Sequence, residues 1–202
     1  MDFFRRFARS ENGSLSVETV ICFPLLAWAF IATFVFWDVF YARSINMRSA
    51  YVVGDALSRE TDYVNAEYIE AMEDLQIFLT KGQYPIRIRV TTVVWDANDN
   101  QFEVEWSHAA DASWSDLTTV TLQAYKDQIP PLATGDVAII VESDLAYSPF
   151  FSVGLRPTRF ADFVVTRPRF GPQLVWENAD GTLIVADGEE NGDEPVDEGD
   201  DA

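Results

Sequence analysis

The longest apolar segment of this chain runs from Thr19 to Trp37, nineteen residues without a charged side chain. As an α-helix it would rise roughly 28 Å, close to the hydrocarbon thickness of a bilayer. The residues from Ala42 to Ser58 contain no proline and one glycine, so nothing in them ends a helix. The pattern therefore predicts one continuous helix from about Val17 to Leu57, whose first half crosses a membrane.

The apolar run is predicted to be a retained membrane helix rather than a removable secretory signal. The apolar core of such signals spans roughly 7–15 residues. The residues that close this run, Phe36 to Phe40, are bulky where signal cleavage needs small residues. Pro24 lies inside the run, and in lipid a proline bends a helix without breaking it because neighbouring groups satisfy the freed carbonyl. We therefore expect a helix kink at Pro24.

Two segments beyond the membrane helix carry helical signals. Thr61 or Asp62 can cap a helix that Gly82 ends, and its apolar residues recur at helical spacing, at Tyr68, Met72, Leu75 and Leu79. Ser115 can cap a shorter helix that Pro130 ends, with apolar positions at Leu117, Val120 and Ala124. The first of these helices is expected to bury its apolar stripe in the core of a domain.

Most of the remaining chain up to residue 186 is rich in branched and aromatic residues that alternate with polar ones, which predicts β-strands. Turn-forming residues at 96–100 and 178–181 separate two pairs of strands, as in hairpins. The predicted strands are Ile86–Trp95, Phe102–Trp106, Val137–Val141, Phe160–Thr166, Gln173–Glu177 and Thr182–Ala186. The predicted fold class is α+β, with a long N-terminal membrane-spanning helix followed by a small antiparallel-sheet domain.

The chain has 33 acidic and 14 basic side chains, and they are unevenly distributed. Residues 1–13 have a net charge of +1, with Arg5, Arg6 and Arg9 against two acids, so the remainder must carry −20 to give the formal total of −19. Residues 187–202 contain nine acids and no base, which predicts a disordered acidic tail. A body this acidic excludes binding to nucleic acid through a general electrostatic field.

The charges on the two sides of the apolar run predict its orientation. Three arginines precede the run, whereas Arg43 and Arg48 follow it, and the positive-inside rule places the more basic side in the cytoplasm. The predicted organisation is a cytoplasmic basic leader at 1–13, a membrane helix with its extension at 14–60, an exported α+β domain at 61–186 and the acidic tail at 187–202.

Side chains that carry catalysis or bind metals are sparse in this sequence. His108 is the only histidine, and no nucleophile or acid forms a triad pattern around it. Asp96, Asn98 and Asn100 imitate the start of an EF-hand loop, but the sixth position of that loop is not the required glycine. The only cysteine, Cys22, cannot form an intrachain disulfide. We therefore expect a protein that is not an enzyme and has no metal or cofactor.

Glu18 is a charged residue at the entrance of the apolar run. A carboxylate at a lipid boundary costs free energy and needs a partner, unless it only reaches out to the polar head groups. If the chain is cut between Gly13 and Ser14, the new α-amine lies about one helical turn from Glu18. Pairing of that amine with Glu18 of a neighbouring chain would offset both desolvation costs and fix the axial stagger of the two helices.

Residues 12–26, NGSLSVETVICFPLL, resemble the prepilin-peptidase site and membrane helix of TadE-like proteins of the tight-adherence pilus system. The clear similarity extends to about Ser58, near a quarter of the chain, and Thr19 stands where the family usually has an aromatic residue. The positions that match the family's pattern are Gly13, Val17, Glu18 and Pro24.

This resemblance implies a minor pseudopilin with a pilin-like fold and a single pass through the bacterial inner membrane. It implies cleavage between Gly13 and Ser14 by a prepilin peptidase and subunit pairing through Glu18. The implied partners are other pilins or pseudopilins, the membrane components of the pilus machinery and the lipid bilayer. The residues themselves leave an alternative open: a membrane-tethered periplasmic binding or sensing module, whose acidic body meets a basic partner or a cation.

Overall fold

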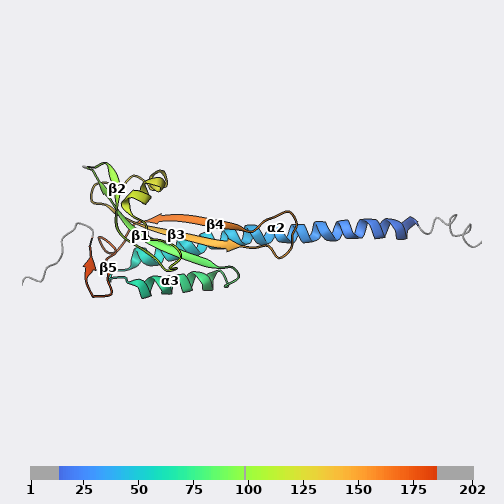
Figure 1. The fold of residues 1–202 in the computed structure, drawn as a ribbon, viewed down its shortest axis with the longest axis horizontal. Coiled ribbons are helices and arrows are strands. Elements are labelled where there is room, and N and C mark those ends of the chain that lie inside the picture. Colours follow the sequence, from blue (N-terminus) through green and yellow to red (C-terminus); the bar gives the residue numbers. More distant parts are fainter. Residues whose placement is uncertain (1–13, 98, 186–202) are drawn as a thin grey trace, which may run out of the picture.

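The computed structural model describes residues 14–97 and 99–185. The predicted basic leader at 1–13, which includes Gly13, and the predicted acidic tail at 187–202 lie outside the described residues. Within them, a long apolar helix is followed by a small domain built on an antiparallel sheet, which confirms this part of the predicted fold. Figure 1 shows the helix extending from the domain as an isolated rod.

Helix α2 spans Ser14–Arg59 and contains 46 residues. It continues through Pro24 as one element, and the bend expected at this proline stays a prediction. The half before Val35 extends away from the domain, whereas Val35 is already buried and the half from Asp38 onwards packs against the sheet (Figure 1). One continuous helix therefore lies in two different environments.

Four antiparallel strands form the main sheet in the order β2-β1-β3-β4. β1 and β2 are the first predicted hairpin, and Asn100 adopts the left-handed conformation in its turn (φ 51°). β5 and β6 are the second predicted hairpin and form a separate small sheet. The strands are β1 (Ile86–Asp96), β2 (Gln101–Ala109), β3 (Val137–Tyr147), β4 (Thr158–Thr166), β5 (Trp176–Glu177) and β6 (Leu183–Ile184).

β3 continues well beyond its predicted end at Val141. The sequence pattern ends there because Glu142 and Asp144 are charged. In the structure Glu142 lies directly opposite Arg89 on β1, and Asp144 lies opposite Arg87. Opposite charges at paired positions stabilise neighbouring strands, so these charged residues extend the strand instead of ending it.

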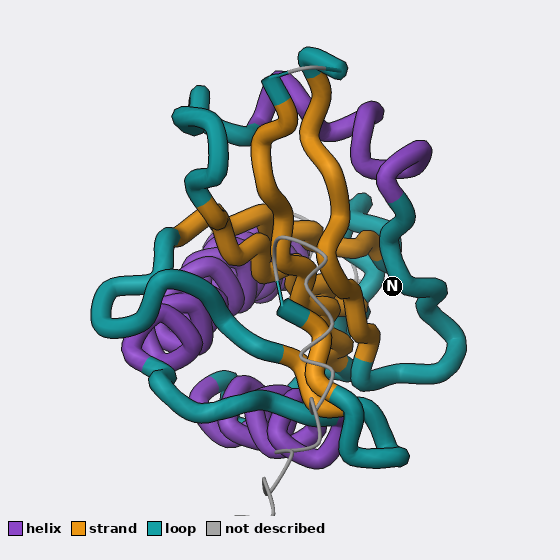
Figure 2. The backbone as a smooth tube through the Cα atoms, turned by 90° about the vertical axis from the view of Figure 1, so that its left-hand side faces the viewer, coloured by secondary structure: helices purple, strands orange, loops and turns teal. Residues whose placement is uncertain are grey.

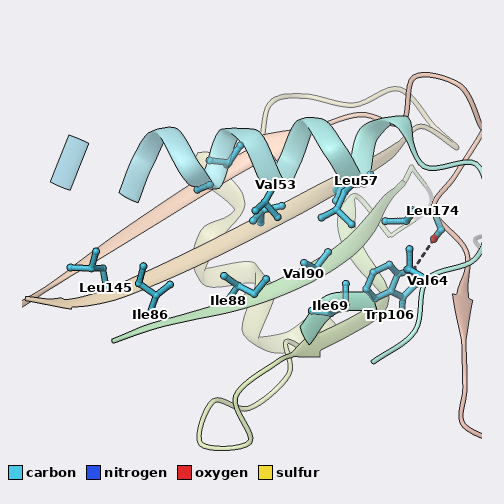
Figure 3. Close-up of a cluster of buried hydrophobic side chains, with 14 of the residues drawn as sticks. Val53, Leu57, Val64, Ile69, Ile86, Ile88, Val90, Trp106, Leu145 and Leu174 are labelled. Atoms are coloured by element: carbon cyan, nitrogen blue, oxygen red, sulfur yellow. Dashed lines mark hydrogen bonds between the residues drawn. The ribbon is translucent and has the colours of Figure 1, made fainter. Parts of the chain in front are cut away.

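Helices cover both faces of the main sheet (Figure 2). α2 and α3 (Ala66–Leu79) lie on one face, where the larger core forms. The short helix α4 (Thr119–Leu122) and the 3₁₀-helix η2 (Gln123–Gln128) lie on the other face over a smaller core. Figure 3 shows side chains of the larger core, in which Val53 and Leu57 of α2 point towards the sheet.

The prediction for the start of α3 is wrong by several residues. Its N-cap is Asn65, whose side chain accepts a backbone hydrogen bond in the first turn (3.0 Å), rather than Thr61 or Asp62. The residue before the cap, Val64, forms a parallel bridge with Trp176 of β5. This pairing keeps the preceding segment extended, so the helix cannot begin earlier.

The buried face of α3 also differs from the predicted stripe. The fully buried side chains of this helix are Ile69 and Gln76. Gln76 is polar and is buried because it hydrogen-bonds to groups of α2 and β3. The members of the predicted stripe are partly buried: Tyr68, Met72, Leu75 and Leu79. Tyr68 and Met72 pack against the larger core as predicted, but the most buried face, with Ile69 and Gln76, is turned relative to the stripe.

The short helix predicted from Ser115 begins later and is shorter. Its N-cap is Thr118, and one α-helical turn is followed directly by η2. The backbone carbonyl of Ser115 accepts a hydrogen bond from Arg89, and the amide of Leu117 donates to a serine hydroxyl of β2. These bonds tie the segment to the sheet before the helix starts, and Val120 is 83 % exposed instead of buried.

Candidate functional site

The first half of α2 presents an apolar surface to its surroundings. Between Val17 and Phe36 most large apolar side chains are exposed, and Phe30, for example, is 75 % exposed. Almost none of the most apolar stretch of this helix is buried. Contiguous exposed apolar surface marks a membrane or protein contact. Within the described part of the chain, α2 is the one helix long and apolar enough to cross a membrane.

Glu18 lies on this surface, in the second turn of α2. Its side chain is exposed, and it has no hydrogen bond or ion pair with another residue that the structure describes. Ser14, the predicted first residue after cleavage, is also the first residue of α2. Cys22 is a free, exposed cysteine one helical turn after Glu18, so the two residues lie on the same side of the helix.

Asp38 is the first charged residue after the apolar run, and the domain holds it at the junction with the helix. Its Oδ2 atom accepts hydrogen bonds from the hydroxyls of Tyr84 (2.6 Å) and Tyr147 (3.0 Å). Gln83 donates to Oδ1 (3.3 Å), and the two tyrosine rings pack with their centroids 4.9 Å apart. Asp38 therefore ties the start of β1 and the end of β3 to the point where α2 leaves the domain.

Both tyrosine hydroxyls are held as hydrogen-bond donors. Burial raises the pKa of Tyr147 to about 12, and the hydrogen bond to the Asp38 carboxylate adds to this rise. Burial and the same carboxylate also raise the pKa of Tyr84. An ionised tyrosine would be a second negative charge beside Asp38, which the site disfavours. The hydroxyls therefore stay protonated, and the contact is preserved, around neutral pH.

A buried polar network joins α2 to the domain about two turns further along the helix. Asn46 is fully buried, and its Nδ2 donates to Asp162 Oδ2 on β4 (2.7 Å). Its Oδ1 accepts from Gln76 Nε2 on α3 (3.1 Å) and from Ser143 Oγ on β3 (3.0 Å). Gln76 also donates to Ser143. Because the four side chains come from four elements, they fix the position of α2 against both the sheet and α3.

The members of this network depend on one another. Burial raises the pKa of Asp162, although the hydrogen bond from Asn46 and the charge of Arg43 oppose this rise. The side-chain oxygen of Gln76, Oε1, is buried without a hydrogen-bond partner among the residues that the structure describes. A buried polar group that loses its partner costs free energy, so removal of one member destabilises the others.

Charged residues on the opposite face of the sheet are paired with one another. Asp144 binds both Arg87 (2.8 Å) and Arg159 (2.7 Å). Burial alone would raise the pKa of Asp144, but the guanidinium groups of Arg159 and Arg87 outweigh it and hold the pKa below its ordinary value. The guanidinium groups of Arg87 and Arg89 lie over the ring of Trp114, 4.6 and 4.5 Å from its centre. This cluster stabilises the pairing of the strands.

The two candidate sites considered in the sequence, the acidic turn between β1 and β2 and His108, lie apart from the junction. Carboxylate oxygens of Asp96, Asp99 and Glu103 lie within 4.8 Å of one another at the β1–β2 turn, in a spacing unlike that of an EF-hand. Exposed acidic groups commonly gather in this way without an ion. His108 packs on the ring of Trp176, with ring centroids 4.9 Å apart. Its contact is with the core and not with a nucleophile.

The residues of the junction are not recognisable from the sequence. Asp38, Tyr84 and Tyr147 come from three distant segments, and no local pattern connects them. Asn46 did carry a signal, because it interrupts an apolar stripe along α2 formed by Val39, Ala42, Ala50, Val53 and Leu57. An amide within an apolar stripe indicates that a buried polar partner is present.

Comparison with protein-family models, with curated proteins and with solved structures finds no match for this chain. The similarity to TadE-like proteins therefore rests on the sequence motif around Gly13 and Glu18.

Proposed function

We propose that this chain is a single-pass inner-membrane protein of the pseudopilin kind, which assembles with other pilin-like subunits and has no enzymatic activity. Its N-terminus would lie in the cytoplasm and its domain in the periplasm. The observation that carries the proposal is Glu18, an exposed carboxylate without a partner among the described residues, on a helix surface that is otherwise apolar. Such a surface needs to be covered, and such a carboxylate needs a cationic partner.

A cleaved neighbouring chain supplies that partner. Cleavage between Gly13 and Ser14 would create an α-amine at the start of α2, roughly 6 Å along the axis from Glu18 of its own helix. If two parallel helices are staggered by four residues, the amine of one lies level with Glu18 of the other. The pairing of the two charges offsets the cost of removing each from water.

Because the junction between α2 and the domain is rigid, pairing of the membrane helices also positions the domains. Asn46 and Asp38 fix α2 to the sheet and to α3 through hydrogen bonds. A stagger set between the membrane helices would therefore be reproduced between the domains, about 30 Å or more away. A flexible linker at this point would let the domains move independently of the stagger between the helices. The stiffness of the junction supports a role in ordered assembly.

The first test is the mass of the mature chain. In cells with an active prepilin peptidase, we expect a chain that begins at Ser14. Replacement of Gly13 by a bulky residue, Gly13→Leu, should leave the full-length chain. A wild-type chain that still begins at Met1 in such cells would contradict processing.

The second test measures the stagger with the single native cysteine. In the proposed register, Cys22 of one helix lies level with residue 26 of its neighbour. Co-expression of the wild-type chain with a Cys22→Ala/Leu26→Cys chain should give more oxidative cross-linking than the wild-type chain alone. A Cys22→Ala/Val20→Cys chain, with its thiol on the opposite side of the helix, is the matched control and should cross-link less.

Glu18 variants then test the charge itself. Glu18→Gln should abolish the cross-link between residues 22 and 26 while the chain remains in the membrane, and Glu18→Asp should retain part of it. Cross-linking that is unchanged in Glu18→Gln would remove the pairing mechanism. Loss of the chain from the membrane would instead assign Glu18 a role in insertion.

A further inference from the structure

The connection between β3 and β4 combines a lack of acidic side chains with two exposed aromatic rings. Its ten residues, SPFFSVGLRP at 148–157, contain one base and no acid, in a chain with 33 acids. Phe150 is 71 % and Phe151 54 % exposed. The two adjacent rings therefore form an apolar tip on an otherwise acidic domain.

Two hydrogen bonds show where this tip lies along α2. Ser143 of β3 is bonded to Asn46, and Tyr147 at the end of the strand is bonded to Asp38. These contacts are about 13 Å apart along the strand and about 12 Å apart along the helix, so β3 runs antiparallel to α2. The chain beyond Tyr147 therefore heads towards the apolar run, which ends at Trp37.

The burial pattern of α2 shows that the domain reaches the apolar run. Val35 is 3 % exposed, whereas its neighbours Phe34 and Phe36 are 58 % and 46 % exposed. Figure 1 shows the connection between β3 and β4 at this part of α2, beyond the ends of both strands. The tip with Phe150 and Phe151 therefore lies level with the end of the segment that is apolar enough to cross a membrane.

We propose that Phe150 and Phe151 enter the interfacial layer of the same bilayer that α2 crosses. Arg156, which is exposed in the same connection, lies at the level of the lipid phosphates. Aromatic rings favour the membrane interface, and a guanidinium group binds phosphate through paired hydrogen bonds. The inference rests on the membrane span of the proposed function, but not on cleavage or on pairing through Glu18.

This second membrane contact has a consequence for orientation. A single helix that leaves the bilayer can tilt together with its domain, whereas a helix and a loop define two points of contact. The hydrogen bond between Tyr147 and Asp38 holds the end of β3, and with it the tip, to α2. The domain would therefore keep one end against the membrane and direct the other end away from it.

The far end of the domain offers a matched control residue. Phe170 is 71 % exposed, as much as Phe150. The backbone of its neighbour Arg169 is bonded to Ser58 (2.7 Å), which is roughly 30 Å along α2 from Asp38. Phe150 and Phe170 thus have the same ring and the same exposure at opposite ends of the domain.

The test uses the full chain in vesicles of phosphatidylcholine with a minor fraction of phosphatidylglycerol. In a Cys22→Ser background, Phe150→Cys and Phe170→Cys each carry one environment-sensitive fluorophore. Quenching by spin-labelled lipid reports contact with the bilayer, and quenching by aqueous iodide reports contact with water. We expect quenching by lipid to be several-fold stronger at position 150 than at 170, and quenching by iodide to be weaker.

Three outcomes would overturn the proposal. Equal quenching at the two positions would place the tip in water. Protection from iodide at position 150 without quenching by lipid would mean that another protein, or a second copy of this chain, covers the tip. Addition of Phe151→Ser to the labelled Phe150→Cys chain should weaken quenching by lipid. Unchanged quenching would show that the fluorophore itself, and not the loop, partitions into the bilayer.

A third labelled position separates this proposal from the one on which it rests. Phe30→Cys lies in the middle of the apolar run and should be quenched strongly by lipid. If it is quenched and position 150 is not, only the membrane contact of the tip is wrong. If Phe30→Cys is not quenched, the membrane span itself is wrong.

Discussion

The two halves of α2 are parts of one continuous helix, but the first half is mostly exposed and the second half has one face buried against the domain. From Val17 to Phe36 most large apolar side chains face outwards. From Asp38 to Arg59 the helix buries an apolar stripe against the domain, together with polar groups such as Asn46 and Ser49. The helix alone therefore does not decide which of its faces is buried and which is exposed. The material that covers each half decides which side chains are buried.

The difference also separates two kinds of interaction. The first half depends on apolar surface and, in our proposal, on one charge pair between chains. The second half depends on hydrogen bonds that join four elements at defined positions. Apolar contacts allow helices to slide and rotate against their surroundings, whereas a buried hydrogen-bond network fixes one arrangement. The helix is adaptable in one half and fixed in the other.

The strongest test of this comparison introduces charge at matched positions in the two halves. Phe30→Lys/Phe34→Lys places two charges in the apolar run and should cost about 6 kcal/mol of insertion free energy. Met47→Lys/Tyr51→Lys has the same spacing at exposed positions of the second half and should have little effect. Retention in the membrane after alkaline carbonate extraction measures the outcome. Equal retention of both variants would mean that the first half does not lie in lipid.

The next test removes one polar side chain from each half. Asn46→Leu removes one buried hydrogen-bond partner each from Gln76, Ser143 and Asp162 and should lower the free energy of unfolding by about 3 kcal/mol. Thr33→Val removes an exposed hydrogen bond to a backbone carbonyl of α2 and should change it by less than about 0.5 kcal/mol. Thermal unfolding in detergent, followed by near-ultraviolet circular dichroism, measures both. Similar losses would show that the network has no special role.

A smaller effect is expected at the close approach of α2 to the sheet. A Cβ atom at Gly54 would lie 3.5 Å from Val164 Cγ1, an ordinary contact. Gly54→Ala should therefore fit and raise the free energy of unfolding by about 0.5–1 kcal/mol, because alanine has the higher helix propensity. Gly54→Leu should overpack the contact and lower it by about 2 kcal/mol. A destabilised alanine variant in the same unfolding experiment would mean that the helix lies closer to the sheet.

The smallest effect is the pH dependence of the network. Because the pKa of Asp162 is raised in the folded state, the folded state binds this proton more tightly than the unfolded state. The contribution of Asp162 is therefore present at acid pH and is lost as the pH rises through the folded pKa. Asp162→Asn should remove this decline, since its amide oxygen can still accept from Asn46. The midpoint of thermal unfolding as a function of pH measures the change.

The opposite sign is expected at Asp144. Its pKa is lowered, so its contribution is present above the ordinary aspartate pKa and is lost as the pH falls through the folded value. A pH profile that is identical in Asp162→Asn and in the wild-type chain would contradict the role assigned to burial at Asp162.

Local patterns were sufficient where neighbouring residues decide the structure. The apolar run, the alternating residues of β1 and the turn before β2 are recognisable within a few positions. The predicted starts of α3 and α4 were wrong because distant groups intervene there. Val64 is extended because it pairs with Trp176, and Ser115 is outside a helix because Arg89 binds its carbonyl. Neither contact can be predicted from the residues next to Val64 or Ser115.

The sequence by itself determined that a long apolar helix precedes an α+β domain, and that Glu18 stands at the start of this helix. Only the tertiary structure decided which part of α2 is fixed to the domain and which is free to meet other molecules. Helix periodicity and propensity act over a few residues, whereas the bond between Asn46 and Asp162 joins positions 116 residues apart. Such a contact forms only when the fold brings the two side chains together.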